Sequence, residues 1–156
     1  MTTETDCENI YRNARRTAGL TQERWAELLG LSVEAVSQYE RGTILPSDEV
    51  VLRMAEAAGQ QIVCYWHLLN KSRVAGTVLP GIKKRPLPEA VLNLLVQVEE
   101  FRRSGLEDLK RIAADGKISG ADESIAYADA LEQIRLMIEA AYELQYAEKH
   151  VSSGIT

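Results

Sequence analysis

The sequence predicts an all-α protein in which a five-helix N-terminal domain precedes a C-terminal helical domain. Apolar residues recur three and four positions apart in every long segment, a spacing that is typical of amphipathic helices. Serine, threonine and glycine stand at the ends of those segments, where helix caps need them. No segment alternates apolar and polar residues in a way that securely predicts a β-strand.

Five short helices are predicted within residues 1–71. The first covers 6–18, and Gly19 stops it. A side-chain oxygen at an N-cap can accept a hydrogen bond from a free amide of the first helical turn, and three residues are predicted to do so: Thr21, Ser32 and Ser47. The helices that follow these caps are predicted to stop at Gly30, Gly42 and Gly59. The fifth helix covers 61–70.

Beyond the fifth helix, residues 72–86 are predicted to form a linker, because glycine and proline interrupt the segment and no apolar spacing persists. Helices are then predicted at 87–103 and 106–114, followed by a turn at 115–117 and a long helix over 122–150. The last residues, 151–156, are expected to form a flexible tail. The predicted parts of the chain are therefore 1–71, 72–86, 87–150 and 151–156.

The composition excludes several classes of protein. Hydrophobic residues make up 46% and charged residues 26% of the 156 residues, which is ordinary for a globular chain and unlike a disordered one. No apolar run reaches the ~20 residues of a membrane span, and no secretory signal is recognisable, so we expect a cytoplasmic protein without a membrane partner. The net charge of −5 argues against a sequence-blind, histone-like binder of nucleic acid, but it allows a local basic face.

No residue spacing in the chain indicates a metal site, a disulfide framework or a catalytic centre. Cys7 and Cys64 lie far apart, and His67 and His150 are isolated in the sequence, so we expect free thiols and ordinary histidines. No nucleophile–base pair and no glycine-rich phosphate loop is recognisable. We therefore expect neither an enzyme nor a cofactor.

Residues 20–42 carry the most informative pattern, which predicts two helices joined by a very short turn. Gly30 is expected to take a positive φ, since the chain must reverse there without a Cβ clash. Ala26 is small at the point where the two helices would cross. Val36 and Tyr39 would bury one face of the later helix, which leaves its opposite face polar and exposed. A helix of this kind can enter the major groove of DNA and bond base edges.

Over residues 8–69 the chain resembles the Cro and repressor type of helix-turn-helix, also called the xenobiotic-response-element family. The resemblance rests on four short motifs: Thr21-Gln22, Leu31-Ser32, Gln38-Tyr39-Glu40-Arg41-Gly42 and Pro46-Ser47. It implies a lambda-repressor-like fold of five helices and a transcriptional regulator that binds double-stranded DNA. It also implies that Glu40 pairs with Arg15 to fix the scaffold without touching DNA.

The same resemblance implies which side chains meet DNA, on and around a recognition helix at 32–41. Gln22 would contact a phosphate and brace a side chain of that helix, and Gln38 could bond both N6 and N7 of adenine. Glu34 is a departure, because a carboxylate near phosphates is favourable only if it accepts from cytosine N4 or is braced by Gln22. The full set is Gln22, Ser32, Val33, Glu34, Ser37, Gln38, Arg41 and Thr43, of which Arg41 and Thr43 would contact the DNA backbone.

A short basic run, Lys83, Lys84 and Arg85, lies in the predicted linker. Two interpretations of it stay open at this point. It is either a solvated loop or a further contact to the phosphate backbone or the minor groove.

The apolar stripe of residues 87–150 predicts self-association, because two or three helices cannot cover it alone. Helix-turn-helix repressors usually bind palindromic operators as dimers whose recognition helices lie ~34 Å apart. We therefore expect a homodimeric repressor, phage-like or acting on its own operon. One alternative is an antitoxin-like module whose C-terminal helices hold a partner protein while the N-terminal domain binds DNA. Another is a C-terminal half that senses a small ligand.

Overall fold

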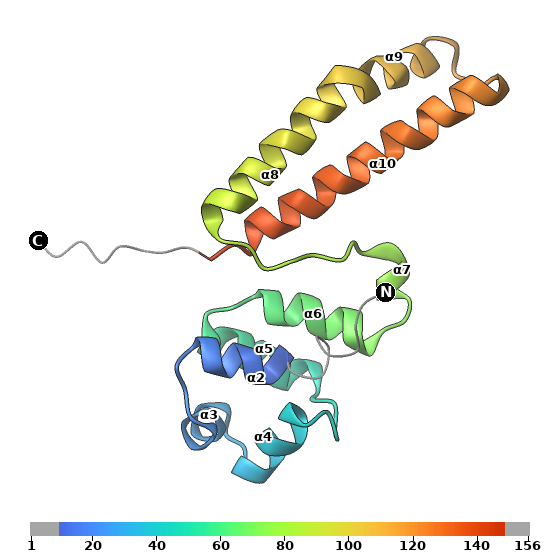
Figure 1. The fold of residues 1–156 in the computed structure, drawn as a ribbon. Coiled ribbons are helices and arrows are strands. Elements are labelled where there is room, and N and C mark those ends of the chain that lie inside the picture. Colours follow the sequence, from blue (N-terminus) through green and yellow to red (C-terminus); the bar gives the residue numbers. More distant parts are fainter. Residues whose placement is uncertain (1–9, 149–156) are drawn as a thin grey trace, which may run out of the picture. The chain divides into compact units, whose positions relative to one another are not determined.

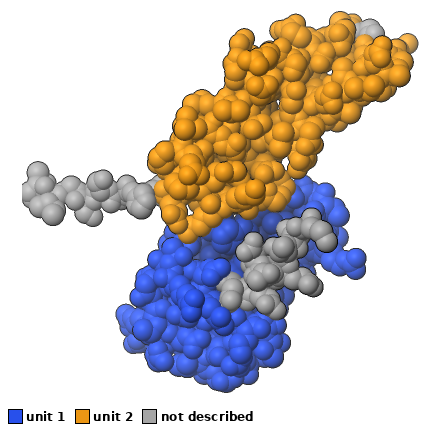
Figure 2. All heavy atoms as spheres, viewed as in Figure 1, with its two compact units in different colours: residues 1–79 blue, residues 80–156 orange. Residues whose placement is uncertain are grey.

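The computed structural model describes residues 10–148, without the side chain of Asp115, as helices joined by short connections (Figure 1). It divides into two compact units, and the boundary falls between Leu79 and Pro80 (Figure 2). No strand occurs in the part of the chain that is described, apart from one isolated bridge pair, so the predicted all-α class is confirmed. None of the described helices combines the length and the apolar character that a membrane span requires.

The helices of the N-terminal unit match the five predicted ones and differ from them only at their ends. They are α2 (Ile10–Thr17), α3 (Gln22–Leu29), α4 (Val33–Glu40), α5 (Asp48–Ala58) and α6 (Ile62–Lys71), and the short α7 (Ala75–Val78) follows. The predicted start of the first helix at Asp6 lies outside the described residues. The same holds for Cys7, for His150 and for the expected tail at 151–156.

The predicted caps form at the starts of α3, α4 and α5. The hydroxyl groups of Thr21, Ser32 and Ser47 accept hydrogen bonds from the amide three residues later, at 3.2, 3.1 and 3.4 Å. Gly30 ends α3 with a φ of 64°, as predicted for the reversal of the chain. A residue with a Cβ is strained in this left-handed conformation, so glycine makes the tight turn between α3 and α4 possible.

A continuous core holds α2 to α6 together. Trp25 and Leu29 of α3, Val36 of α4 and Met54 of α5 are fully buried in it. Burying a side chain of this size contributes about 1.5–3 kcal/mol to stability. Ala26 is only 2% exposed, in keeping with its predicted place where α3 and α4 approach each other closely. The core therefore packs the two helices of the turn against each other.

The second unit is an antiparallel helical hairpin (Figure 1). One arm consists of α8 (Leu87–Glu100), η1 (Phe101–Gly105) and α9 (Leu106–Asp115), and the other arm is α10 (Gly120–Gln145). The predicted helices at 87–103 and 106–114 are therefore one continuous arm, joined by the π-helical η1. The predicted helix at 122–150 begins earlier and ends earlier than expected.

Gly105 lies at the point where the sequence indicates a break and the structure has a continuous arm. A Cβ atom on Gly105 would lie 2.5 Å from Oε1 of Gln133 on the opposite arm. The glycine therefore permits a close approach of the two arms and does not end a helix. Next to it, the amide nitrogen of Gln133 donates to the Ser104 hydroxyl at 3.1 Å, which ties η1 to α10.

A buried carboxylate, Glu143 of α10, anchors the open end of the hairpin. It is 1% exposed and accepts hydrogen bonds from the Lys83 amide at 3.0 Å, from Nε of Arg85 at 2.5 Å and from Nδ2 of Asn93 at 3.0 Å. A buried charge is tolerated only when donors surround it in this way. Glu143 thus joins the chain before α8, α8 itself and α10.

The segment 72–86, predicted as a linker, is divided between the two units. It contains α7, which belongs to the N-terminal unit, while residues 80–86 belong to the hairpin. Ile82 is 8% exposed, and Nζ of Lys84 lies 2.6 Å from Oε1 of Glu148. The sequence could not predict these contacts, because they join residues about 60 positions apart and the short segment shows no repeating apolar pattern.

Replacing Glu143 with alanine is expected to lower the free energy of unfolding of the hairpin by about 2–3 kcal/mol, because three donors lose their acceptor and Arg85 loses its counter-charge. Urea unfolding followed by far-ultraviolet circular dichroism measures this loss. The matched control is Glu132→Ala on the same helix, where an exposed pair with Arg135 is removed and a loss below about 0.5 kcal/mol is expected. Equal losses in the two variants would contradict the anchoring role of Glu143.

Candidate nucleic-acid interface

The turn between α3 and α4 is held by hydrogen bonds from both sides. The Gly30 amide donates to the carbonyl groups of Ala26 and Glu27, and the Leu31 amide donates to Ala26 at 2.9 Å. From α5, Nη1 of Arg53 donates to the Leu29 carbonyl at 2.7 Å. Arg53 satisfies a carbonyl that the end of α3 would otherwise leave without a partner. The sequence did not predict this hydrogen bond, because Arg53 lies 24 residues after Leu29.

The residues predicted to bind DNA gather on the outward side of α4 and at its two ends. Val33 is 40% exposed, and the side chains of Glu34 and Arg41 are 68% and 50% exposed. Ser37 and Gln38 are half-buried. They lie on the same side as Val33 and Glu34, because residues four apart are neighbours along a helix. Ser32 and Thr43 are exposed just before and just after α4.

Glu34 binds two of the other predicted contact residues. Its Oε1 accepts from Nε2 of Gln38 at 3.3 Å and from Nη2 of Arg41 at 3.0 Å. Nη1 of Arg41 also donates to the Ser37 hydroxyl at 2.8 Å. Arg41 therefore offsets the charge of Glu34 on the exposed side of α4.

Within the recognition helix, the side chain that Gln22 braces is Glu40 and not Glu34, which was one of two alternatives for Glu34. Nε2 of Gln22 donates to Oε2 of Glu40 at 2.8 Å. Both carboxylates lie on α4, but Glu40 faces α3 and the core while Glu34 faces solvent, so only Glu40 is within reach. The amide of Gln22 thus links the start of α3 to the end of α4.

Arg15 and Glu40, the expected scaffold pair, form a two-point ion pair. Nε and Nη2 of Arg15 donate to the two carboxylate oxygens of Glu40 at 2.5 and 2.9 Å. Glu40 is only 1% exposed, and Nε of Arg12 lies 3.6 Å away as a second cation. Burial alone would raise the pKa of Glu40. The hydrogen bonds from Arg15 and Gln22, with the charges of Arg15 and Arg12, outweigh burial and hold the pKa of Glu40 below its usual range.

A second polar cluster surrounds His67, which the sequence pattern left isolated. The Tyr11 hydroxyl lies 2.7 Å from Nδ1 of His67, and Oδ1 of Asp48 lies 3.1 Å from Nε2. Burial raises the pKa of Tyr11 to about 12, so the phenol keeps its proton and can donate a hydrogen bond to His67. Hydrogen bonds from Lys71 and His67 lower the pKa of Asp48. The cluster joins α2, α5 and α6 and is structural.

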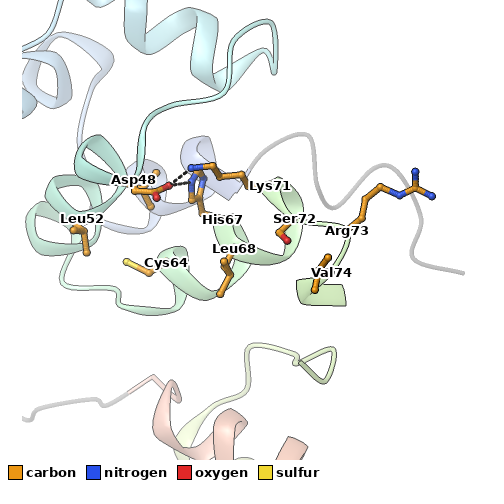
Figure 3. Close-up of a pocket in the computed structure, with 10 residues that line it drawn as sticks. Asp48, Leu52, Cys64, His67, Leu68, Lys71, Ser72, Arg73 and Val74 are labelled. Carbon is orange, nitrogen blue, oxygen red and sulfur yellow. Dashed lines mark hydrogen bonds and ion pairs between the residues drawn. The ribbon is translucent and has the colours of Figure 1, made fainter. Parts of the chain in front are cut away.

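A groove of about 760 Å³ lies beside this cluster, between α5, α6 and the turn that follows (Figure 3). Its walls are mostly apolar, and the ion pair of Lys71 and Asp48 stands at one end. The apolar lining residues are Val51, Leu52, Cys64, Leu68 and Val74. Contacts between α5 and α6 build this surface, so no local motif could have revealed it.

Two cations of the basic run 83–85 already bind carboxylates in the structure. Arg85 pairs with the buried Glu143, and Lys84 pairs with Glu148. The side chain of Lys83 is exposed, while its backbone amide donates to Glu143. A phosphate contact by Lys84 or Arg85 would have to replace one of these ion pairs, whereas the side chain of Lys83 is exposed.

Replacing Glu40 with glutamine is expected to destabilise the N-terminal unit by about 1.5–3 kcal/mol at neutral pH, because Arg15 loses its counter-charge. The folded state lowers the pKa of Glu40, so the carboxylate contributes its stability above the unfolded pKa and loses it as the pH falls through the folded value. The gap between wild type and variant should therefore narrow at about pH 3. Urea unfolding followed by the fluorescence of Trp25 and Trp66 reads this unit alone, since the chain has no other tryptophan.

The control for this measurement is Glu56→Gln, an exposed glutamate on α5, which should leave stability unchanged at both pH values. A gap between wild type and the Glu40 variant that stays constant from neutral to acid pH would contradict the role assigned to the charge.

Comparison with known proteins agrees with the geometry of this region. Residues 12–62 match a family model described as a helix-turn-helix domain, and this range runs from α2 to the first residue of α6. No curated protein and no solved structure matches the chain. Over residues 12–62 the chain is therefore similar to helix-turn-helix domains.

Proposed function

We propose that the protein is a sequence-specific DNA-binding transcriptional regulator, a repressor that binds a palindromic operator as a homodimer through α4. One observation carries the proposal. The polar outer side of α4 is held at a fixed angle to α3 by the buried Glu40, which binds Arg15 and Gln22. A reading helix must be held rigidly, because hydrogen bonds to base edges tolerate little error in position.

The dimensions of α4 suit the major groove. An α-helix with its side chains is about 10–12 Å across, and the groove is about 12 Å wide. In the helix-turn-helix docking geometry, the N-terminal residues of the second helix approach the bases. Here those residues are Ser32, Val33 and Glu34, which are exposed. The partial positive charge at the start of the helix also favours nearby phosphates.

The proposed contacts divide into base readers and backbone contacts. Gln38 would bond adenine, and Glu34 would accept from cytosine N4, with Arg41 close enough to offset its charge. Arg41 and Thr43 would contact phosphates, which fix register but carry no sequence information directly. Since Arg41 is bonded to Glu34 and Ser37 in the free chain, a phosphate contact exchanges those exposed hydrogen bonds for a charge-assisted one.

The negative net charge of the chain favours binding to DNA as a dimer. With a net charge of −5, one subunit gains little from unspecific attraction to phosphates. Two subunits double the number of cation–phosphate contacts and place two copies of α4 on half-sites ~34 Å apart. Occupation of such an operator excludes other proteins from the same DNA, which is the physical basis of the proposed repression.

Selection of bound sequences from random duplex DNA with the full chain tests the proposal, with the mass of the complex measured on the enriched site. Enrichment of a palindrome bound by two chains supports it. A single half-site bound by one chain would remove the homodimer from the proposal. If no sequence is enriched, α4 does not read DNA by itself, and the antitoxin-like alternative would take its place.

Gln38→Ala is expected to relax the preference at one base pair of each half-site by about 1–3 kcal/mol and to leave the other positions unchanged. Quantitative binding to single-base variants of the selected site measures this. Gln61→Ala, an exposed glutamine at the start of α6, is the matched control and should keep the full preference. Unchanged preference in the Gln38 variant would show that α4 meets the bases with other side chains.

Arg41→Ala is expected to weaken binding to all sequences alike and to reduce the slope of log affinity against log salt by about one per subunit. Filter binding or fluorescence anisotropy over a range of salt concentrations gives both quantities. Arg111→Ala, an exposed arginine of α9 paired with Asp108, is the control. A loss confined to one base position would make Arg41 a base reader instead.

A further inference from the structure

The second unit buries small side chains and leaves large aliphatic ones exposed. Among its described residues, the buried apolar side chains are those of Ile82, Ala90, Ala130, Ala140 and Ala147. The exposed ones include Val91, Leu95 and Val98 on α8, and Leu131 and Ile138 on α10, which are between 38% and 59% exposed. Large apolar side chains that gather on one side of a unit indicate an interaction site. Large residues between the arms, such as Leu94, Ile134 and Met137, are only half-buried, so the hairpin alone buries little apolar area.

The five large residues lie on one side of the hairpin. On α8 each follows a residue that faces α10: Val91 follows the buried Ala90, and Val98 follows the half-buried Gln97. On α10 Leu131 follows the buried Ala130, and Ile138 follows the half-buried Met137. One residue further along a helix is a rotation of 100° in a fixed sense. In two antiparallel helices that face each other, the residue after an inward-facing one therefore lies on the same side of the hairpin in both helices.

The hydrogen bonds between the arms set the level of these residues along the hairpin. Asn93 forms a hydrogen bond with Glu143, and Ser104 forms one with Gln133. The residue numbers of each pair add up to 236 or 237, so two residues on opposite arms lie level with each other when their numbers have about this sum. Val98 is therefore level with Ile138. We call the surface formed by Val91, Leu95, Val98, Leu131 and Ile138 the apolar face.

The side of the hairpin that carries the apolar face is large enough for a stable interface between proteins. The 26 residues of α10 span about 39 Å, and two adjacent helices are about 20 Å wide, which gives a side of about 800 Å². Specific interfaces bury about 800 Å² on each partner. Two cations lie on the same side of the hairpin, because Arg102 follows Val98 by four residues and Arg135 follows Leu131 by four. Arg102 is paired with Glu99 and Arg135 with Glu132, so covering this side would bury these charges as ion pairs.

We infer that the apolar face binds the same face of a second copy of this chain and forms a four-helix bundle. Val91 and Val98 are seven residues apart, as are Leu131 and Ile138, with Leu95 between the first two at the spacing of a helix-packing seam. A second copy brings rows of identical spacing and length, and a twofold axis lets each row meet its counterpart. This inference rests on the homodimer of the proposed function and assigns it to named side chains.

Sedimentation equilibrium of the full chain without DNA tests the assignment. Wild type is expected at twice the mass of one chain. Val98→Glu and Ile138→Glu should each raise the dissociation constant of the dimer more than about tenfold, because a carboxylate would be buried unpaired. The matched control is Val96→Glu, a somewhat more exposed valine of α8 that the same helical rotation puts on the other side of the hairpin. It should leave the dimer intact, and circular dichroism checks that all variants fold.

A further variant, Leu52→Glu, removes an exposed leucine from the groove of the N-terminal unit. Dissociation by Leu52→Glu alone would move the interface to that groove and overturn the inference. So would a monomeric wild type, or equal effects of Val96→Glu and Val98→Glu. These outcomes are independent of the DNA selection, which can fail while the chain remains a dimer. Conversely, a monomeric chain that still enriches a DNA sequence would leave the reading role of α4 in place.

Discussion

The candidate interface depends on one buried carboxylate. Glu40 lies at the end of α4 and binds Arg15 of α2 and Gln22 of α3, so three helices meet at two oxygen atoms. The apolar core packs these helices together, but apolar packing is not directional and tolerates small rotations. Charge-assisted hydrogen bonds have a defined geometry and remove that freedom. The outer side of α4 can therefore present Val33, Glu34 and Gln38 in a fixed orientation, while the inner side of the helix is buried against α2 and α3.

The second unit uses the same device for a different purpose. Glu143 is as buried as Glu40 and also accepts from an arginine and an amide side chain, but it joins the two ends of a hairpin. Around Glu40 the core contains large side chains such as Trp25 and Met54, and around Glu143 it contains alanines. The N-terminal unit therefore has a core of large side chains, whereas several large aliphatic side chains of the hairpin are exposed.

The two surfaces of the chain differ in chemistry in a way that suits different tasks. On α4 the outward groups are polar apart from Val33, and Glu34, Ser37, Gln38 and Arg41 bind one another in the free chain. Such groups can exchange their partners for bases and phosphates at small net cost, because the bonds that they lose are exposed to water. On the hairpin, Val98 and Ile138 have no polar atoms to satisfy, and covering them releases ordered water.

The sequence by itself determined the helices of the N-terminal unit, the turn at Gly30 and the residues of α4 that face outward, because caps, glycines and apolar spacing act over a few residues. It also indicated the pairing of Arg15 with Glu40, although only through resemblance. Only the tertiary structure decided that Gln22 binds Glu40 and not Glu34, that Arg53 secures the turn, and that Lys84 and Arg85 belong to the hairpin. It likewise decided that Gly105 joins two helices instead of separating them. Each of these depends on side chains brought together from distant positions, and local spacing carries no record of which partner lies within hydrogen-bonding distance.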